Sequence, residues 1–154
     1  MAAGPSGQGF TRILVPTDFS AGSSRAWAVA QRLAHDLGAE LILVHVLVET
    51  PLYSEGPFSM QRTRTVFEAA RAGVEKTLGE WTAAATAEGL SVRWLARSGT
   101  PHVEIIDVAN AEQADLIVVG THGRAGLDRA LLGSVADRVI RTARCPVVTV
   151  RTTE

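Results

Sequence analysis

Five short runs of apolar and β-branched residues alternate with longer helical patterns along most of this chain. Apolar residues spaced three and four apart predict four helices, over residues 20–37, 62–88, 101–113 and 134–143. The apolar runs predict strands over residues 12–16, 40–48, 91–97, 116–119 and 146–151. Strands separated by helices of this length are joined by right-handed parallel crossovers. The sequence therefore predicts an α/β three-layer sandwich around a five-stranded parallel sheet.

The predicted helices carry recognisable boundaries and apolar faces. Gly38 and Gly89 are placed to end the first two helices, and Thr100-Pro101 supplies an N-cap and a first helical residue for the third. The inward faces are expected to include Leu37 in the first helix, Phe67, Ala70, Val74, Leu78, Trp81 and Ala85 in the second, Val103 and Ile106 in the third, and Val135, Val139 and Ile140 in the fourth.

Length and composition favour one globular domain. With 154 residues and 46% hydrophobic residues, we expect a single domain over residues 10–152, after a disordered N-terminal tail at residues 1–9. A net charge of −1 argues against nucleic-acid binding. No apolar stretch reaches the roughly 20 residues of a membrane helix, and the tail lacks the apolar core of a secretion signal. A single cysteine fits a reducing compartment, so we expect a cytoplasmic protein with no membrane contact.

A glycine loop follows the fourth predicted strand. Gly120-Thr121-His122-Gly123 comes directly after an apolar run, and Gly133-Ser134 follows nine residues later, at the start of the last helix. Glycines let backbone N–H groups approach a phosphate chain, and a helix N-terminus adds partial positive charge. No lysine follows these glycines as in a P-loop, and the first strand lacks the GxGxxG fingerprint. The pattern predicts an anion site of another type.

The end of the first predicted strand carries a second signal, Pro16-Thr17-Asp18. In a doubly wound sheet, ligands bind at the carboxyl ends of the strands where the strand order reverses. Asp18 is placed either to cap the following helix or to contact a ribose hydroxyl or a metal ion. Both interpretations stay open, and no metal ligand is assigned.

The segments ILVPTDFS and LIVVGTHGRAGLDRALLGSVADRVIRTARCPVVTVR together resemble the universal stress protein family over about residues 10–151. The spacing of Gly120, Gly123, Gly133 and Ser134 matches the diagnostic pattern of its ATP-binding branch. The resemblance implies strand order 3-2-1-4-5, an adenine nucleotide alpha hydrolase-like, Rossmann-like fold, and ATP as the ligand, with Mg²⁺ as a possible companion ion.

The resemblance also implies a role for each matching residue. Asp18 would lie near the ribose or adenine, Pro16 and Thr17 would form the floor of the base pocket, and the backbone of Val46 would read the adenine edge. Gly120 would lie against the ribose. The phosphates would be wrapped by Gly123, Arg124, Gly133, Ser134 and Val135.

The sequence favours ATP binding over turnover. His122 has no orienting acid near it in the sequence and is expected to pack within the loop, and His45 is expected to be a hydrogen-bonded core histidine. We therefore assign no catalytic residue. Slow Mg²⁺-dependent ATP hydrolysis through Asp18 and the loop is one alternative, and a nucleotide-free interaction module is the other.

The last predicted strand favours a homodimer. Residues 147–150 form an uncharged edge strand, which exposes unpaired backbone groups. The resemblance implies that two such strands pair antiparallel across a two-fold axis. A further protein partner is expected but not identified. Residues 49–61 are expected to form a mobile loop, and whether it closes over the ligand stays open.

Overall fold

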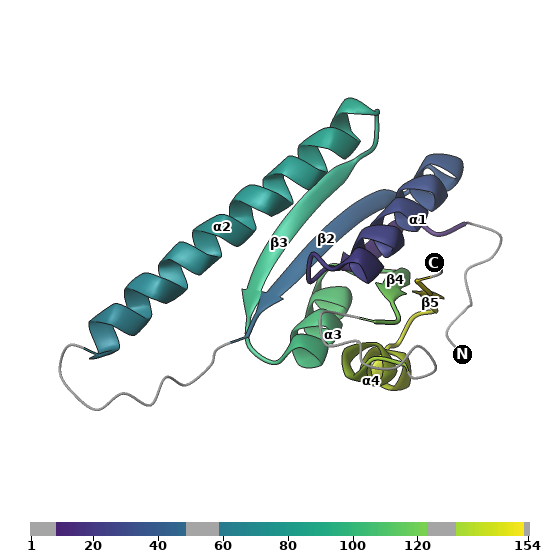
Figure 1. Cartoon of the computed structure of the whole chain (residues 1–154). Coiled ribbons are helices and arrows are strands. Elements are labelled where there is room, and N and C mark those ends of the chain that lie inside the picture. The colour runs from purple at the N-terminus through teal and green to yellow at the C-terminus, as the bar shows by residue number, and fades with distance from the viewer. Residues whose placement is uncertain (1–8, 49–58, 123–131, 153–154) are drawn as a thin grey trace.

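The computed structural model describes residues 9–48, 59–122 and 132–152, so most of the predicted tail and most of the predicted 49–61 loop lie outside the described residues. All nine predicted elements are present, and their boundaries agree with the prediction to within a few residues. In chain order they are β1 Arg12–Pro16, α1 Ala21–Leu37, β2 Glu40–Leu47, α2 Ser59–Ala87, β3 Val92–Ser98, α3 Pro101–Ala111, β4 Leu116–Gly120, α4 Ser134–Thr142 and β5 Val147–Val150 (Figure 1).

The five strands form one parallel sheet in the order β3-β2-β1-β4-β5, which confirms the predicted order. From β1 the chain builds outward through β2 to β3, and it then returns to the other side of β1 to add β4 and β5. The strand order therefore reverses between β1 and β4. Ile13 pairs with Leu116 and Leu14 with Ile117 at this junction.

Helices cover both faces of the sheet, as the three-layer prediction requires (Figure 1). Side chains alternate along each strand, so β1 sends Ile13 and Val15 to one face and Leu14 to the other. The first face packs against α1 and α2, including Trp27 and Leu78. The second face packs against α3 and α4. All three of these β1 side chains are fully buried, which explains the nearly continuous apolar strands.

Local capping explains where α1 begins and ends. The Ser20 hydroxyl accepts a hydrogen bond from the backbone N–H of Ser23, and Gly38 adopts the left-handed conformation at the other end, with φ 67°. Thr100 occupies the N-cap position of α3, but its side chain makes no capping hydrogen bond. The start of α3 is therefore favoured by Pro101, whose fixed φ suits the first helical position.

Helix α2 is longer than the strand it covers. Its 29 residues span about 43 Å at 1.5 Å per residue, whereas the seven residues of β3 span about 23 Å. Leu78 and Ala85 are buried, but Ala70 is exposed and Phe67 is only partly buried. The predicted inward face of α2 is therefore correct only for its C-terminal half.

Three other predicted core residues are exposed: Leu37 by 43%, Val103 by 44% and Ile140 by 42%. In α3 the buried face is formed by Ile105, Val108 and Ala109 instead. In α4 it is formed by Ala136 and Val139. Helical spacing places apolar residues on a broad face, and only the part of that face that meets the sheet is buried.

The amino-terminal edge of the sheet is held by charged side chains. The Asp115 carboxylate accepts hydrogen bonds from the backbone N–H groups of Thr11 and Arg12 and from the Thr11 hydroxyl, at 2.8–3.0 Å. Burial opposes its ionisation, but these hydrogen bonds outweigh burial and lower the pKa of Asp115. Arg93 bridges Glu40 and Glu112 nearby, and the hydrogen bond from Arg93 lowers the pKa of Glu112.

Candidate functional site

The two sequence signals meet at the reversal of the strand order. β1 ends at Pro16 and its neighbour β4 ends at Gly120, both at the carboxyl edge of the sheet. The chain leaves β1 toward α1 on one face and leaves β4 toward α4 on the other face. Such diverging strand ends open a crevice in doubly wound sheets. The structure thus brings Pro16, Thr17 and Asp18 next to Gly120.

Thr17 is 5% exposed and its polar groups bond within the protein. Its N–H donates to the Val44 carbonyl at 2.8 Å, and its carbonyl oxygen lies 2.7 Å from Nδ1 of His45. Its hydroxyl lies 3.0 Å from that of Ser23 and accepts from the N–H of Phe19. Because a carbonyl only accepts, His45 carries a proton on Nδ1. These hydrogen bonds hold Thr17 in place at the end of β1. His45 is hydrogen-bonded, as the sequence predicts.

Asp18 is not the N-cap of α1, because Ser20 holds that position. Instead, Oδ1 of Asp18 accepts a hydrogen bond from the backbone N–H of Ser20 at 3.0 Å, which makes an Asx turn before the helix. The prediction that Asp18 caps α1 is therefore wrong. One carboxylate oxygen supports the turn, and the side chain is half-buried just after the end of β1.

Phe19 adopts a left-handed backbone conformation with φ 62°, which is rare for an aromatic residue. Its ring stacks on His45, with 4.8 Å between ring centroids, and meets Trp81 of α2 edge-on at 5.5 Å. Stacking between three elements compensates the backbone strain. The turn after Asp18 is thereby tied to β2 and α2.

The backbone of Val46 faces the crevice. Pairing between β1 and β2 ends at Pro16 and Val44, and the Val44 carbonyl points toward β1, where it accepts from Thr17. Alternate residues of a strand direct their N–H and C=O groups to the same neighbour. Val46 lies two residues further on, so its backbone polar groups point past the end of β1.

Gly120 and Gly133 are both in very close contact with other backbone. A Cβ at Gly120 would lie 2.8 Å from the carbonyl group of Gly22 in α1, and one at Gly133 would lie 2.7 Å from the carbonyl oxygen of Thr121. The expectation that these glycines make room for a ligand is therefore incomplete. They are first required so that β4, α1 and α4 can converge.

The first turn of α4 faces the place where β4, α1 and α4 come together. The N–H of Gly133 donates to the Thr121 carbonyl at 2.6 Å. As the N-cap of α4, Gly133 has no side chain with which to cap the helix, Ser134 is exposed, and Val135 is partly buried. This helix end therefore suits an anion better than the start of α1, which Ser20 caps. Gly123 and Arg124 lie outside the described residues.

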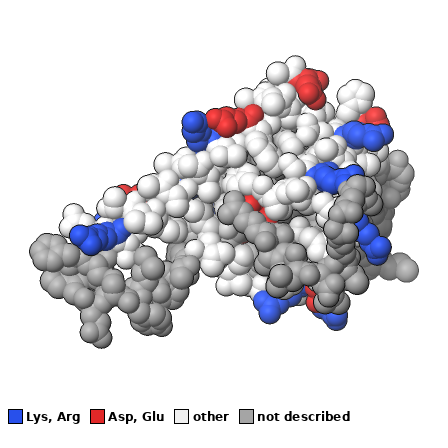
Figure 2. All heavy atoms as spheres, viewed as in Figure 1, with Lys and Arg blue, Asp and Glu red and all other residues white. Residues whose placement is uncertain are grey.

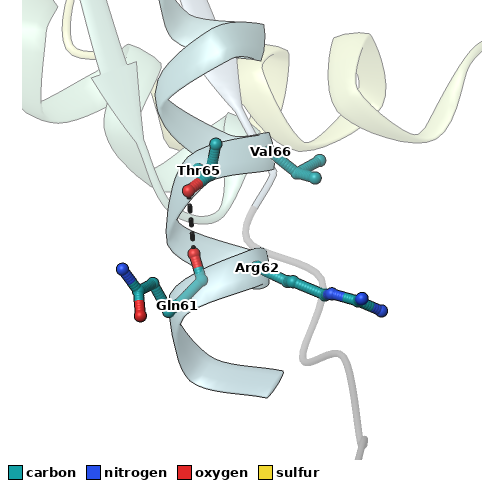
Figure 3. A pocket seen from close by; sticks show the side chains of 4 residues that line it. All are labelled: Gln61, Arg62, Thr65 and Val66. Carbon is teal, nitrogen blue, oxygen red and sulfur yellow. Dashed lines mark hydrogen bonds between the residues drawn. The ribbon is translucent and has the colours of Figure 1, made fainter. Parts of the chain in front are cut away.

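An open hollow of about 380 Å³ lies elsewhere, beside the first turns of α2. It is lined by Gln61, Arg62, Thr65 and Val66, and the Thr65 hydroxyl donates to the Gln61 carbonyl within the helix (Figure 3). Figure 3 shows Arg62 and Val66 pointing away from Gln61 rather than converging with it. Among the described residues, the lining of the hollow offers no set of convergent polar groups from separate elements, so we place the candidate site at the strand-order reversal.

Within residues 9–48, 59–122 and 132–152, no three His, Cys, Asp or Glu side chains gather as a metal site would require. In the same residues no helix is long and apolar enough to cross a membrane. The His122 ring bonds the Thr121 hydroxyl at 2.9 Å, in agreement with a packing role.

Several residues that shape the site were not predicted from the sequence. The serines of Ser20-x-x-Ser23 could have been found from their capping spacing. Phe19 and Gly22 gave no such signal. The left-handed φ of Phe19 and the close approach of β4 to Gly22 are visible only in three dimensions.

A family model describes almost the whole chain. The model of the universal stress protein family matches residues 9–151, which include both strand ends and the glycine pattern. This chain belongs to the universal stress protein family. The universal stress protein MJ0531 of Methanocaldococcus jannaschii is 35% identical over 147 residues, covering 92% of this chain and 82% of the relative.

Solved structures agree with this assignment. A structure of MJ0577, also from Methanocaldococcus jannaschii, aligns with a TM-score of 0.83 at 27% identity, covering 94% of this chain and 98% of that one. A universal stress protein in complex with cAMP aligns with a TM-score of 0.69 at 26% identity and covers 94% and 98% of the two chains. The family and the parallel α/β fold are therefore firmly assigned.

Proposed function

We propose that this chain is a regulatory universal stress protein that binds ATP at the reversal between β1 and β4. One observation carries the proposal, namely that β1 and β4 are neighbouring strands whose ends lie side by side. β1 ends at Pro16 and continues into Thr17 and Asp18, and β4 ends at Gly120. The N-cap residue of α4, Gly133, is hydrogen-bonded to Thr121, directly after Gly120. A solved relative in complex with cAMP adds support for an adenine nucleotide.

The described residues fit such a ligand. The backbone groups of Val46 point past the end of β1 and are placed for the edge of the base, above the floor formed by Pro16 and Thr17. Asp18 is placed for the ribose, next to Gly120. Ser134, Val135 and Gly133 begin a helix whose N-terminus favours the phosphates. Gly123 and Arg124 are proposed phosphate contacts by resemblance alone.

We take residues 10–152 as the functional domain and a cytoplasmic homodimer as the working form. β5 lies at the edge of the sheet, with Val148 36% exposed, and the N–H and C=O groups along its outer edge suit pairing with a second copy. No nucleic acid partner is proposed. Acidic and basic side chains alternate along α2 (Figure 2), where Arg64 pairs with Glu68 and Arg71 with Glu75. A nucleic-acid binder would instead present a clustered basic face.

We infer binding without turnover, and two contacts among the described side chains support this inference. His122 bonds its neighbour Thr121, and one oxygen of Asp18 supports a turn, so neither is arranged as a base for a water molecule. A slow Mg²⁺-dependent hydrolysis through Asp18 is the second candidate, because its carboxylate follows directly after the end of β1.

The proposal is tested by calorimetric titration of the purified protein with ATP, with and without Mg²⁺, and with ADP, AMP and cAMP in parallel. Gly133→Asp places a carboxylate at the start of α4 and should abolish ATP binding. Gly73→Asp is the matched control, because Gly73 is exposed on α2 with open space around it. It should bind ATP as the unaltered protein does.

Each outcome separates the candidate functions. Heat of ATP binding that disappears only in Gly133→Asp supports the proposal. An unaltered protein with no binding heat and no co-purified adenine nucleotide would favour the interaction module. Phosphate released over many turnovers, and lost in Asp18→Ala, would favour the hydrolase.

A further inference from the structure

Gly22 belongs to neither of the sequence signals, yet it makes the closest backbone approach among the described glycines. A Cβ built on it would clash with the carbonyl oxygen of His122. Gly22 lies in the first turn of α1 and has no positive φ that would require glycine. Glycine is a poor helix former, so the contact, and not the local conformation, explains the residue.

The contact joins the two halves of the candidate site. On one side, α1 begins at the turn formed by Asp18, Ser20 and Ser23, which continues the end of β1. On the other side, Gly120 lies directly against the carbonyl group of Gly22, and His122 lies above the same residue. Gly22 therefore sets how closely the start of α1 approaches the β4 exit.

The same contact also fixes where the glycine loop starts. His122 immediately precedes Gly123, and Gly133, the first described glycine after the loop, donates its N–H to Thr121 at 2.6 Å. The Thr121 N–H in turn donates to the Val150 carbonyl of β5 at 3.0 Å. His122 and Gly133, the described residues that flank positions 123–131, are thus both tied to a short stretch of backbone that rests on Gly22.

We propose that Gly22 is a positioning residue for the nucleotide, acting through the backbone of Gly120, Thr121 and His122. The inference rests on the proposed function. A methyl group at position 22 would move the β4 exit away from α1, because its nearest neighbour is a backbone atom that no rotamer change can displace. A ligand that spans both halves would lose affinity, whereas one that touches only the base half would be much less affected.

The test compares Gly22→Ala with the unaltered protein for ATP, by calorimetry, and for adenine, by NMR titration. We expect ATP to bind about tenfold more weakly or worse, because sites tolerate only about 0.5 Å of misplacement. Adenine binding should change by less than about threefold, since the base touches only the β1 and β2 ends, which stay in place. Ser24→Ala in the same turn and Gly73→Ala on open α2 are controls, and both should bind ATP normally.

Three results would overturn the inference. ATP binding by Gly22→Ala at the unaltered strength would show that the contact does not matter. Equal losses for ATP and adenine would indicate a general structural effect. If Gly22→Ala does not fold, the test is made on the unaltered protein by NMR. The amide resonances of Gly22, Thr121 and Gly133 should shift together as ATP is added. A Gly22 resonance that does not shift contradicts the positioning role. An unaltered protein that binds no ATP would refute the proposed function itself.

Discussion

Nδ1 of His45 donates a hydrogen bond to the carbonyl oxygen of Thr17, 2.7 Å away. The bond joins the carboxyl ends of β1 and β2 just beyond their last paired residues, Pro16 and Val44. It therefore fixes the floor of the proposed base pocket from a neighbouring strand.

We expect His45→Phe to destabilise the protein by about 1–3 kcal/mol, because the buried Thr17 carbonyl loses its partner while an aromatic ring still stacks on Phe19. Chemical denaturation measures the loss. His35→Phe serves as control, since His35 is exposed and contacts Asp36 at the surface. A His45→Phe variant as stable as the unaltered protein would show that this hydrogen bond contributes nothing.

Asp115→Asn should cost about 1–2 kcal/mol at pH 7, because charged acceptors make the stronger hydrogen bonds. The pKa of Asp115 is lowered in the folded protein, so the unfolded chain takes up its proton first as the pH falls. Its contribution is complete above about pH 5 and is lost as the pH falls below the unfolded pKa of about 3.9 and through the folded pKa. Denaturation at pH 7 and pH 3 should therefore give a smaller difference between the two proteins at pH 3.

Gly73→Ala should stabilise the protein by up to about 1 kcal/mol, since alanine is the better helix former and nothing lies within 4 Å of the new methyl group. Gly120→Ala should destabilise it, because the same methyl group would meet the backbone of Gly22 at 2.8 Å. Thermal unfolding of both variants measures the contrast. Equal shifts of the same sign would refute the packing explanation.

Cys145 should react slowly in the folded protein. Burial, together with the negative charge of Asp115, raises the pKa of its thiol. The rate of alkylation by iodoacetamide, followed against pH, should reach half its maximum above about pH 8.5, the value for an unperturbed thiol. The chain unfolded in guanidinium chloride provides the reference, and a folded midpoint at or below that reference would contradict the prediction.

Val148→Lys should convert a dimer to a monomer, because a charge on the edge strand β5 opposes pairing with a second copy. Sedimentation at micromolar protein measures the mass. Val103→Lys is the control, since Val103 is similarly exposed but lies on α3. A monomeric unaltered protein would refute the proposed homodimer.

The sequence was sufficient for the strands and for the meeting of the two strand ends, because apolar runs and glycine spacing are local patterns. It was insufficient for packing. Val103 and Ile140 have the spacing of core residues, but the sheet does not reach them. Gly120 has the spacing of a ligand loop, but its nearest neighbour is Gly22, 98 positions away in the chain. Such contacts depend on how elements cross, which no local pattern encodes.

The N-terminal half of α2 extends beyond β3, and we expect it to unfold locally more readily than the C-terminal half. Leu78, Thr82 and Ala85 anchor its C-terminal half in the core, whereas no described side chain from Met60 to Thr77 is buried. The first turns are supported mainly by pairs such as Arg64 with Glu68, each worth only a few tenths of a kcal/mol. Amide hydrogen exchange should therefore form a gradient along α2, with local unfolding that starts at Ser59 and stops near Leu78 while the sheet stays intact.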